Sequence, residues 1–232
     1  MFCPSQSFAE SQWLKKAGDF ANSQMNTAKG VSLSDTKIGE GLKEALKVGI
    51  ENAIKVTGKT DGYFTNDLIK IVMPPKLQMM EKPLRMAGFG KQIDEFILSM
   101  NRAAETAAPS AQEIFLDAIF NVTISDVQTL YNGGPTAATD FLRSKTYKKL
   151  RGQFAPVVTK SLAQYNVTKK YQGIIQYYQQ MPMAQKFPAP SIEDYVVGKS
   201  LDGLFMVLAQ EEAKIRKDPA ARTTDLLKEI FK

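Results

Sequence analysis

The stretch LKEALKVGIENAIKV, residues 42–56, decides the fold class of this chain. Its apolar and small residues recur at spacings of three and four, at Leu42, Leu46, Gly49, Ala53 and Val56. In an α-helix these positions share one face, whereas a half-buried strand would need strict alternation. The stretch therefore predicts an amphipathic helix whose apolar stripe packs against a core.

The same periodicity recurs in residues 91–107 and 194–217. The predicted buried faces are Ile93, Phe96, Ile97, Met100 and Ala104 in the first segment, and Leu201, Leu204, Phe205, Leu208 and Ile215 in the second. Residues 112–120 contain only three polar side chains, which predicts a helix buried on most sides. Strand signals are few, because the β-compatible IKIVMPP of residues 69–75 is short and its prolines end it.

We therefore predict an all-α protein. Residues 31–232 are expected to form a single multi-helix, bundle-like domain of about ten helices. Residues 10–30 are expected to form an N-terminal helical extension. Glycine and proline mark the expected breaks. These lie near residues 58–62, 74–75, 88–90, 133–135 and 182–190, and near Pro109, Pro156 and Pro219.

The stretch YNGGPTAATDF, residues 131–141, has two interpretations. A phosphate-binding loop would follow a strand and usually place a lysine after the last glycine. Here a helical stretch precedes the glycines and no lysine follows, which favours a break between two helices. A left-handed glycine at 133 or 134 would end the first helix. Thr136 or Thr139 would cap the second.

Composition excludes several kinds of site. The 232 residues include no histidine, which is the commonest general base and metal ligand. The single cysteine, Cys3, permits neither an internal disulfide nor a cysteine–histidine metal site. We expect no metal, no cofactor and no enzymatic activity. No apolar run approaches the roughly 20 residues of a membrane span.

One catalytic alternative remains, in which Glu211 and Glu212 act as paired carboxylates with an arginine. Adjacent residues on a helix point about 100° apart, so this pair would not flank one substrate atom. We therefore rank catalysis below binding.

Charge is unevenly distributed along the chain, whose net charge is +6. Residues 141–192 contain no aspartate or glutamate and nine basic residues interleaved with aromatic ones. Basic and aromatic residues together are typical of nucleic-acid binding, and also of binding to anionic envelope molecules. The alternative is a solvated basic face. The candidate head-group ligands are Arg143, Lys145, Lys148, Lys149 and Arg151.

Several polar residues lie beside the apolar stripes. Glu212 lies on the core side of its predicted helix, and Asn101 flanks the stripe of residues 91–107. Arg102 and Glu105 are three apart and predict a pair on one helix face. Arg222 is a candidate partner for a buried carboxylate, which would otherwise be costly. The residues predict either a polar pocket or a structural salt-bridge network.

The N-terminal residues 1–9, MFCPSQSFA, are uncharged and end in Ser7-Phe8-Ala9. Small residues at these positions are typical of a signal-peptidase site, so we interpret residues 1–9 as the tail of an export signal. The alternative is an ordinary cytoplasmic N-terminus.

Four segments together resemble one bacterial family. They are GLKEALKVGIENAI, LSMNRAAETAAPSAQEIFLDAI, NGGPTAATDFLRSKT and the C-terminal run from DYVVGKSLDGLF to TTDLLKEIF. The chain resembles the domain-of-unknown-function family 4197 over about residues 31–232. The resemblance implies a protein exported to the periplasm of Gram-negative bacteria, without an established activity. It also points to Asp140, within the third segment, as a further member of the polar network.

Two functions follow from these observations. The first is non-enzymatic binding of an anionic or amphipathic cell-envelope molecule, such as an anionic lipid or an envelope polymer. Nucleic acid is the weakest partner for an exported protein. The second is a structural or protein-interaction role, in which residues 10–30 dock on a partner or on a second copy of the chain. Trp13, Leu14, Ala17 and either Phe20 or Ala21 would form the docking stripe.

Overall fold

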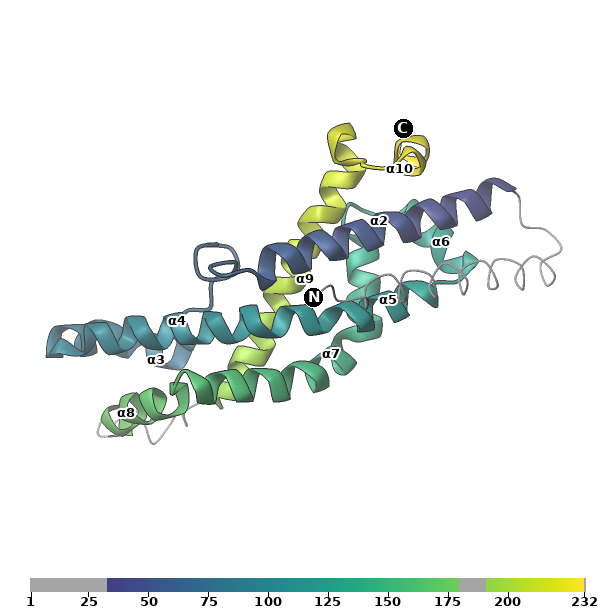
Figure 1. Ribbon diagram of the computed structural model, residues 1–232. Helices are drawn as coiled ribbons and strands as arrows, with labels where there is room; N and C mark the ends of the chain where they lie inside the picture. Colours follow the sequence, from purple (N-terminus) through teal and green to yellow (C-terminus); the bar gives the residue numbers. More distant parts are fainter. Residues whose placement is uncertain (1–32, 180–190, 232) are drawn as a thin grey trace, which may run out of the picture.

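A computed structural model describes residues 33–179 and 191–231 (Figure 1). The expectations for residues 1–9 and 10–30 lie outside the described residues. The α-helices are α2 (Leu33–Gly58), α3 (Pro75–Leu84), α4 (Gly90–Ala107), α5 (Gln112–Phe120), α6 (Ile124–Tyr131), α7 (Ala137–Gln164), α8 (Val167–Gln179), α9 (Ile192–Lys217) and α10 (Asp225–Ile230). A π-turn, η1 (Arg85–Phe89), and two 3-10 turns, η2 (Ala108–Ala111) and η3 (Pro219–Ala221), complete the described elements.

The predicted all-α class is confirmed, because the described part of the chain contains no strand. The expected number of about ten helices is wrong. Counted as uninterrupted segments, and leaving aside the short turn η3, the described residues form seven helices. The reason is that α3, η1, α4, η2 and α5 follow one another without a gap. The break expected near 88–90 is present, because Gly88 has a non-helical φ of 90° and turns the chain between α3 and α4. Pro109 lies at the start of η2 and does not interrupt the helical run. None of the described helices combines the length and the apolarity needed to cross a bilayer.

Helix α9 organises the core. It contacts α2, α4 and α7, and Figure 1 shows it crossing all three. Buried side chains from α2 through α10 join in one hydrophobic cluster. The predicted stripes of α4 and α9 are all buried, which confirms those two faces. Helix α5 is less buried than predicted, since only Ile114, Phe115 and Ile119 are inside.

Helix α7 has no ordinary amphipathic stripe. Its buried residues follow a spacing of four, as Ala138, Leu142, Thr146, Leu150, Phe154, Val158 and Leu162. Four residues turn about 40° more than one full turn, so this ridge winds around the helix and α7 crosses its neighbours obliquely. Pro156 lies inside α7, which corrects the predicted break. Its exposed side faces away from the ridge, where a missing N–H bends a helix without opening the core.

The break at residues 133–135 is confirmed, but its chemistry differs from the prediction. Among the described glycines only Gly88 has a positive φ, so neither Gly133 nor Gly134 is left-handed. Gly133 is required for space, because a Cβ there would lie 2.5 Å from the Cβ of Ala137. Thr136 is the N-cap residue of α7, without a side-chain capping bond.

Candidate functional site

Three of the five candidate head-group residues form ion pairs with other helices. Arg143 Nη2 lies 2.6 Å from Asp202 Oδ1 on α9. Its guanidinium also lies 5.3 Å from the ring centre of Phe205. These contacts place Arg143 in the packing between α7 and α9.

Lys149 and Arg151 also form ion pairs with residues of other helices. Lys149 Nζ lies 3.0 Å from Asp117 Oδ2 on α5, and Arg151 pairs with Asp194 on α9. The acid-free composition of residues 141–192 therefore does not leave all its charges free. Carboxylates from α5 and α9 neutralise these two residues and Arg143.

The remaining two candidates, Lys145 and Lys148, lie on the outer side of α7 together with Lys160. In the described part of the chain these three ammonium groups form no ion pair. Helical geometry places them within about 120° around the axis and over about 22 Å along it. They form a cationic surface, which we call the α7 lysine face. The sequence placed Lys160 in the basic segment but not among the five ligands.

A nearby carboxylate, Asp126 at the start of α6, is already engaged. Thr123 and Asp126 form a capping box, in which Asp126 Oδ2 accepts from the backbone N–H of Thr123 at 2.9 Å and from its hydroxyl at 2.7 Å. These two hydrogen bonds hold the pKa of Asp126 below its ordinary value, and the charge of Lys145 lowers it further. Asp126 therefore stays ionised at neutral pH.

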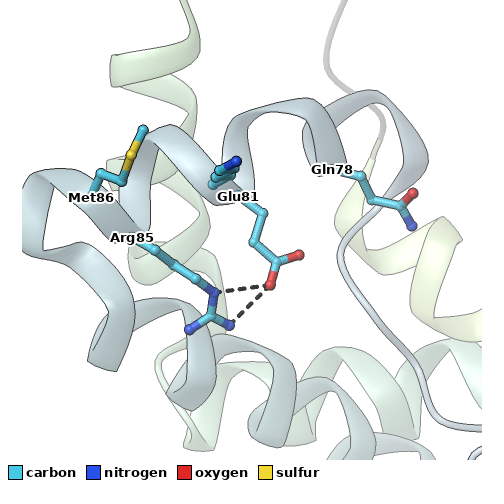
Figure 2. Close-up of a pocket in the computed structure, with 5 residues that line it drawn as sticks. Gln78, Glu81, Arg85 and Met86 are labelled. Atoms are coloured by element: carbon cyan, nitrogen blue, oxygen red, sulfur yellow. Dashed lines mark hydrogen bonds and ion pairs between the residues drawn. The ribbon is translucent and has the colours of Figure 1, made fainter.

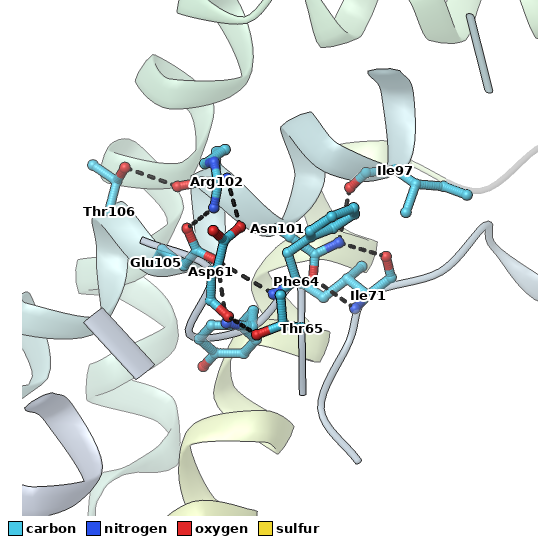
Figure 3. Close-up of polar contacts among 10 residues, drawn as sticks. Asp61, Phe64, Thr65, Ile71, Ile97, Asn101, Arg102, Glu105 and Thr106 are labelled. Atoms are coloured by element: carbon cyan, nitrogen blue, oxygen red, sulfur yellow. Dashed lines mark hydrogen bonds and ion pairs between the residues drawn. The ribbon is translucent and has the colours of Figure 1, made fainter. Parts of the chain in front are cut away.

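Asn101 is fully buried on α4 and binds backbone (Figure 3). Its Oδ1 accepts from Ile71 N at 2.9 Å, and its Nδ2 donates to Ile71 O at 2.8 Å and to Ile97 O at 2.8 Å. The side chain thus pairs with Ile71 as a neighbouring strand would. This explains how the backbone N–H and C=O of Ile71, within the β-compatible segment 69–75, are hydrogen-bonded without a second strand.

Arg102 and Glu105 form the predicted pair, at 2.7 Å between Nη1 and Oε2 (Figure 3). The other oxygen of Glu105 accepts from the backbone N–H of Tyr63 and Phe64. Arg102 also binds Asp61, a residue with a left-handed φ of 64°. Burial alone would lower the pKa of Arg102, but its hydrogen bonds to the two carboxylates raise it.

Glu212 joins α9 to the start of α7. Its carboxylate accepts from the N–H groups of Ala138 and Thr139, at 3.0 and 2.8 Å, and from the Thr139 hydroxyl at 2.8 Å. These N–H groups belong to the first turn of α7, which lacks partners inside its own helix. Arg216 completes the shell, since its Nε lies 2.9 Å from Glu212 and its Nη2 donates to Leu130 O at the end of α6.

Two charged side chains of α9 therefore stabilise the break at residues 132–136. Glu212 satisfies the helix that follows the break, and Arg216 satisfies the one that precedes it. Arg216 was not among the residues predicted from the sequence, although its spacing of four from Glu212 was a usable signal.

The other proposed network members lie elsewhere. Arg222 donates to the carbonyls of Ile215 and Arg216 and so caps the end of α9, which corrects its expected role as a carboxylate partner. Asp140 is exposed and accepts from Thr136 at 3.3 Å. Of the six polar residues, Arg102 and Glu105 thus pair with each other, whereas Asn101, Asp140, Glu212 and Arg222 each belong to a different structural contact.

Glu211 and Glu212 also face different partners. Glu211 accepts from Asn52 on α2 at 3.1 Å and pairs with Lys214. Glu212 faces α6 and α7. No group of three carboxylate or thiol side chains suited to a metal ion occurs in residues 33–179 and 191–231.

An open groove of about 560 Å³ lies on α3 and η1 (Figure 2). It is lined by Gln78, Glu81, Lys82, Arg85 and Met86. Arg85 Nε donates to Glu81 at 3.0 Å and Nη2 to Asp94 at 2.7 Å. The hydrogen bond from Arg85 is the main cause of the lowered pKa of Asp94. This groove was not predicted from the sequence.

Comparison with known proteins locates the chain in one family. No curated protein and no solved structure matches it. Residues 32–232 match the family described as Protein of unknown function (DUF4197), which covers nearly the whole chain and every described helix. The chain therefore belongs to the DUF4197 family.

Proposed function

We propose that this protein binds an anionic or amphipathic molecule of the cell envelope without catalysing a reaction on it. The observation that carries the proposal is the α7 lysine face, where Lys145, Lys148 and Lys160 are exposed and form no ion pair among the described residues. Because Arg143, Lys149 and Arg151 form ion pairs within the protein, only Lys145 and Lys148 remain of the five predicted ligands. The anionic group is a lipid head group or a charged envelope polymer.

The buried carboxylates support a binding role over an enzymatic one. Glu105, Glu211 and Glu212 each accept hydrogen bonds from backbone or side-chain donors that hold helices together. The chain has no histidine to act as a base. A carboxylate engaged in this way is poorly placed to exchange protons with a substrate.

The periplasm is part of the same proposal. It rests on the small-residue pattern at Ser7-Phe8-Ala9 and on what the family resemblance implies. The protein-interaction alternative rests on residues 10–30, which lie outside the described residues.

The test is binding of the full chain to two anionic probes at low ionic strength. One is vesicles of phosphatidylcholine and phosphatidylglycerol in equal parts, and the other is soluble dextran sulfate. Each lysine near an anionic surface contributes about 1 kcal/mol, so Lys145→Gln/Lys148→Gln/Lys160→Gln should weaken binding roughly hundredfold. Added salt should weaken the wild type as well, because it screens exposed charges.

The control variant is Lys55→Gln/Lys59→Gln/Lys217→Gln, which removes the same charge from exposed lysines elsewhere. Its binding should stay near that of the wild type. Absence of wild-type binding to both probes would overturn the proposal, as would an equal loss in the two triple variants. Binding to dextran sulfate alone would identify a polymer as the ligand, and binding to vesicles a lipid.

A further inference from the structure

The turn between α3 and α4 exposes unusually large apolar side chains. Met86 is 74% exposed, Met79 60% and Phe89 43%. Ala87 and Gly88 between them are exposed too, so Met86–Phe89 presents an apolar surface throughout. We call Met79 and Met86 the apolar tip. Exposed apolar groups gathered in this way usually mark an interaction site.

The exposure follows from the packing of α3. Leu77, Met80 and Leu84 face the core and are fully buried or nearly so. Met79 and Met86 are seven apart, so they share the opposite face of the helical course. Met79 and Met80 are thus adjacent methionines of which Met80 packs in the core and Met79 is exposed.

The tip protrudes at one extremity of the molecule. Figure 1 shows the junction of α3 and α4 at the far end of α4 from α5. Gly88 has a φ of 90° and turns the chain there, with no atom near the position of a Cβ. Apolar side chains exposed at such an extremity can reach into the boundary of a membrane, where apolar groups are buried at the level of the head groups.

The charges around the tip favour an anionic surface. Arg85 binds both nearby carboxylates, Glu81 and Asp94. Lys82 and Lys91 line the same end of the molecule and form no ion pair within the described part of the chain. The open groove beside Met86 is lined in part by Lys82 and Arg85 (Figure 2).

We propose that the apolar tip enters the head-group region of an anionic phospholipid bilayer, with Lys82 and Lys91 near the phosphates. The inference rests on the proposed function and selects a lipid surface as the envelope partner. Methionine suits this role because its flexible, apolar side chain adapts to a disordered environment. A lysine near the boundary can bury its apolar stem while its ammonium group stays in water.

Insertion is tested with a polarity-sensitive fluorophore on the full chain. A Cys3→Ser background carries either Met86→Cys or Met206→Cys, each labelled with the same dye. Met206 is a matched control, a 45% exposed methionine on α9. With vesicles of phosphatidylcholine and phosphatidylglycerol in equal parts, the emission of the label at position 86 should shift to the blue, while the label at 206 stays unchanged.

A second measurement uses unlabelled variants. Met79→Gln/Met86→Gln keeps helix-compatible side chains and should lower vesicle partitioning at least about tenfold, while Met206→Gln should have no effect. Vesicle binding that depends on the α7 lysine face but leaves the label at 86 in water would overturn the apolar tip and leave the proposed function standing. Equal shifts at both positions, or binding to dextran sulfate alone, would also overturn it.

Discussion

At the scale of single residues, Glu212 is a buried charge that joins α9 to the start of α7. Its side chain is 8% exposed and is satisfied by α7 and Arg216. Glu212→Gln would leave Arg216 without its carboxylate and turn an amide towards the N–H of a first-turn residue. We expect a loss of about 3 kcal/mol in the free energy of unfolding, as for a broken buried pair. Urea unfolding followed by circular dichroism measures it.

The matched control for this substitution is Glu113→Gln on the exposed side of α5, which should change stability little. Equal losses in both variants would mean that Glu212 is no more than a surface charge.

Asn101 makes a second prediction at the residue scale. Asn101→Leu keeps the volume but leaves the N–H and C=O of Ile71 without partners in the core. The expected cost is roughly 2–3 kcal/mol, which is typical for unsatisfied buried groups. Hydrogen exchange of the Ile71 amide should also become faster. Gln92→Leu, on an exposed position of the same helix, should do neither. Unchanged exchange at Ile71 would refute the pairing.

At the scale of elements, two glycines within helices should respond oppositely to alanine. A Cβ at Gly152 in α7 would have no atom within 4 Å, whereas a Cβ at Gly203 in α9 would lie 2.6 Å from the Tyr63 ring and 3.1 Å from Ile69. Gly152→Ala should stabilise by about 0.5–1 kcal/mol, because alanine loses less backbone entropy. Gly203→Ala should destabilise by about 1–3 kcal/mol through overpacking.

Thermal and urea unfolding of these two variants provide the comparison, each serving as the control for the other. Changes of the same sign would show that helix propensity alone, rather than the approach of Tyr63 to α9, governs both positions.

At the scale of the whole molecule, three tyrosines with raised pKa values make the free energy of unfolding depend on pH in the alkaline range. Burial, with a smaller contribution from Glu193, raises the pKa of Tyr171 to about 12. Burial also raises the pKa of Tyr63 and of Tyr195. An unfolded tyrosine ionises near pH 10, at about its ordinary pKa, so the unfolded chain releases its protons first.

The stability contributed by these tyrosines is therefore complete below about pH 10 and is lost as the pH rises towards the folded pKa values. For Tyr171 that window ends near pH 12. Urea unfolding at a series of alkaline pH values should show a decline that is less steep in Tyr171→Phe. Tyr165→Phe, at a 41% exposed position, should keep the wild-type slope. Equal slopes in the two variants would contradict the shifted pKa.

Prediction from sequence succeeded where the signal is local. The stripe from Ile93 to Ala104 and the Arg102–Glu105 pair each lie on one helix, where spacing alone sets which side chains meet. It failed at Pro156, because a proline on an exposed side is tolerated within a packed helix. It also missed the winding ridge of α7. Because the buried residues are spaced by four, their direction rotates along the 28-residue helix, and no single apolar face is visible in the sequence.

The sequence by itself determined the helical class, the faces of α4 and α9, the positive net charge and the absence of histidine chemistry. Only the tertiary structure decided which charges are paired and which remain free. Arg143 meets Asp202 and Lys149 meets Asp117 across 59 and 32 residues, whereas Lys145 forms no ion pair in the described part of the chain. The physical reason is range. Helical periodicity acts over a few residues, but an ion pair needs two atoms within about 4 Å, and only packing brings distant helices that close.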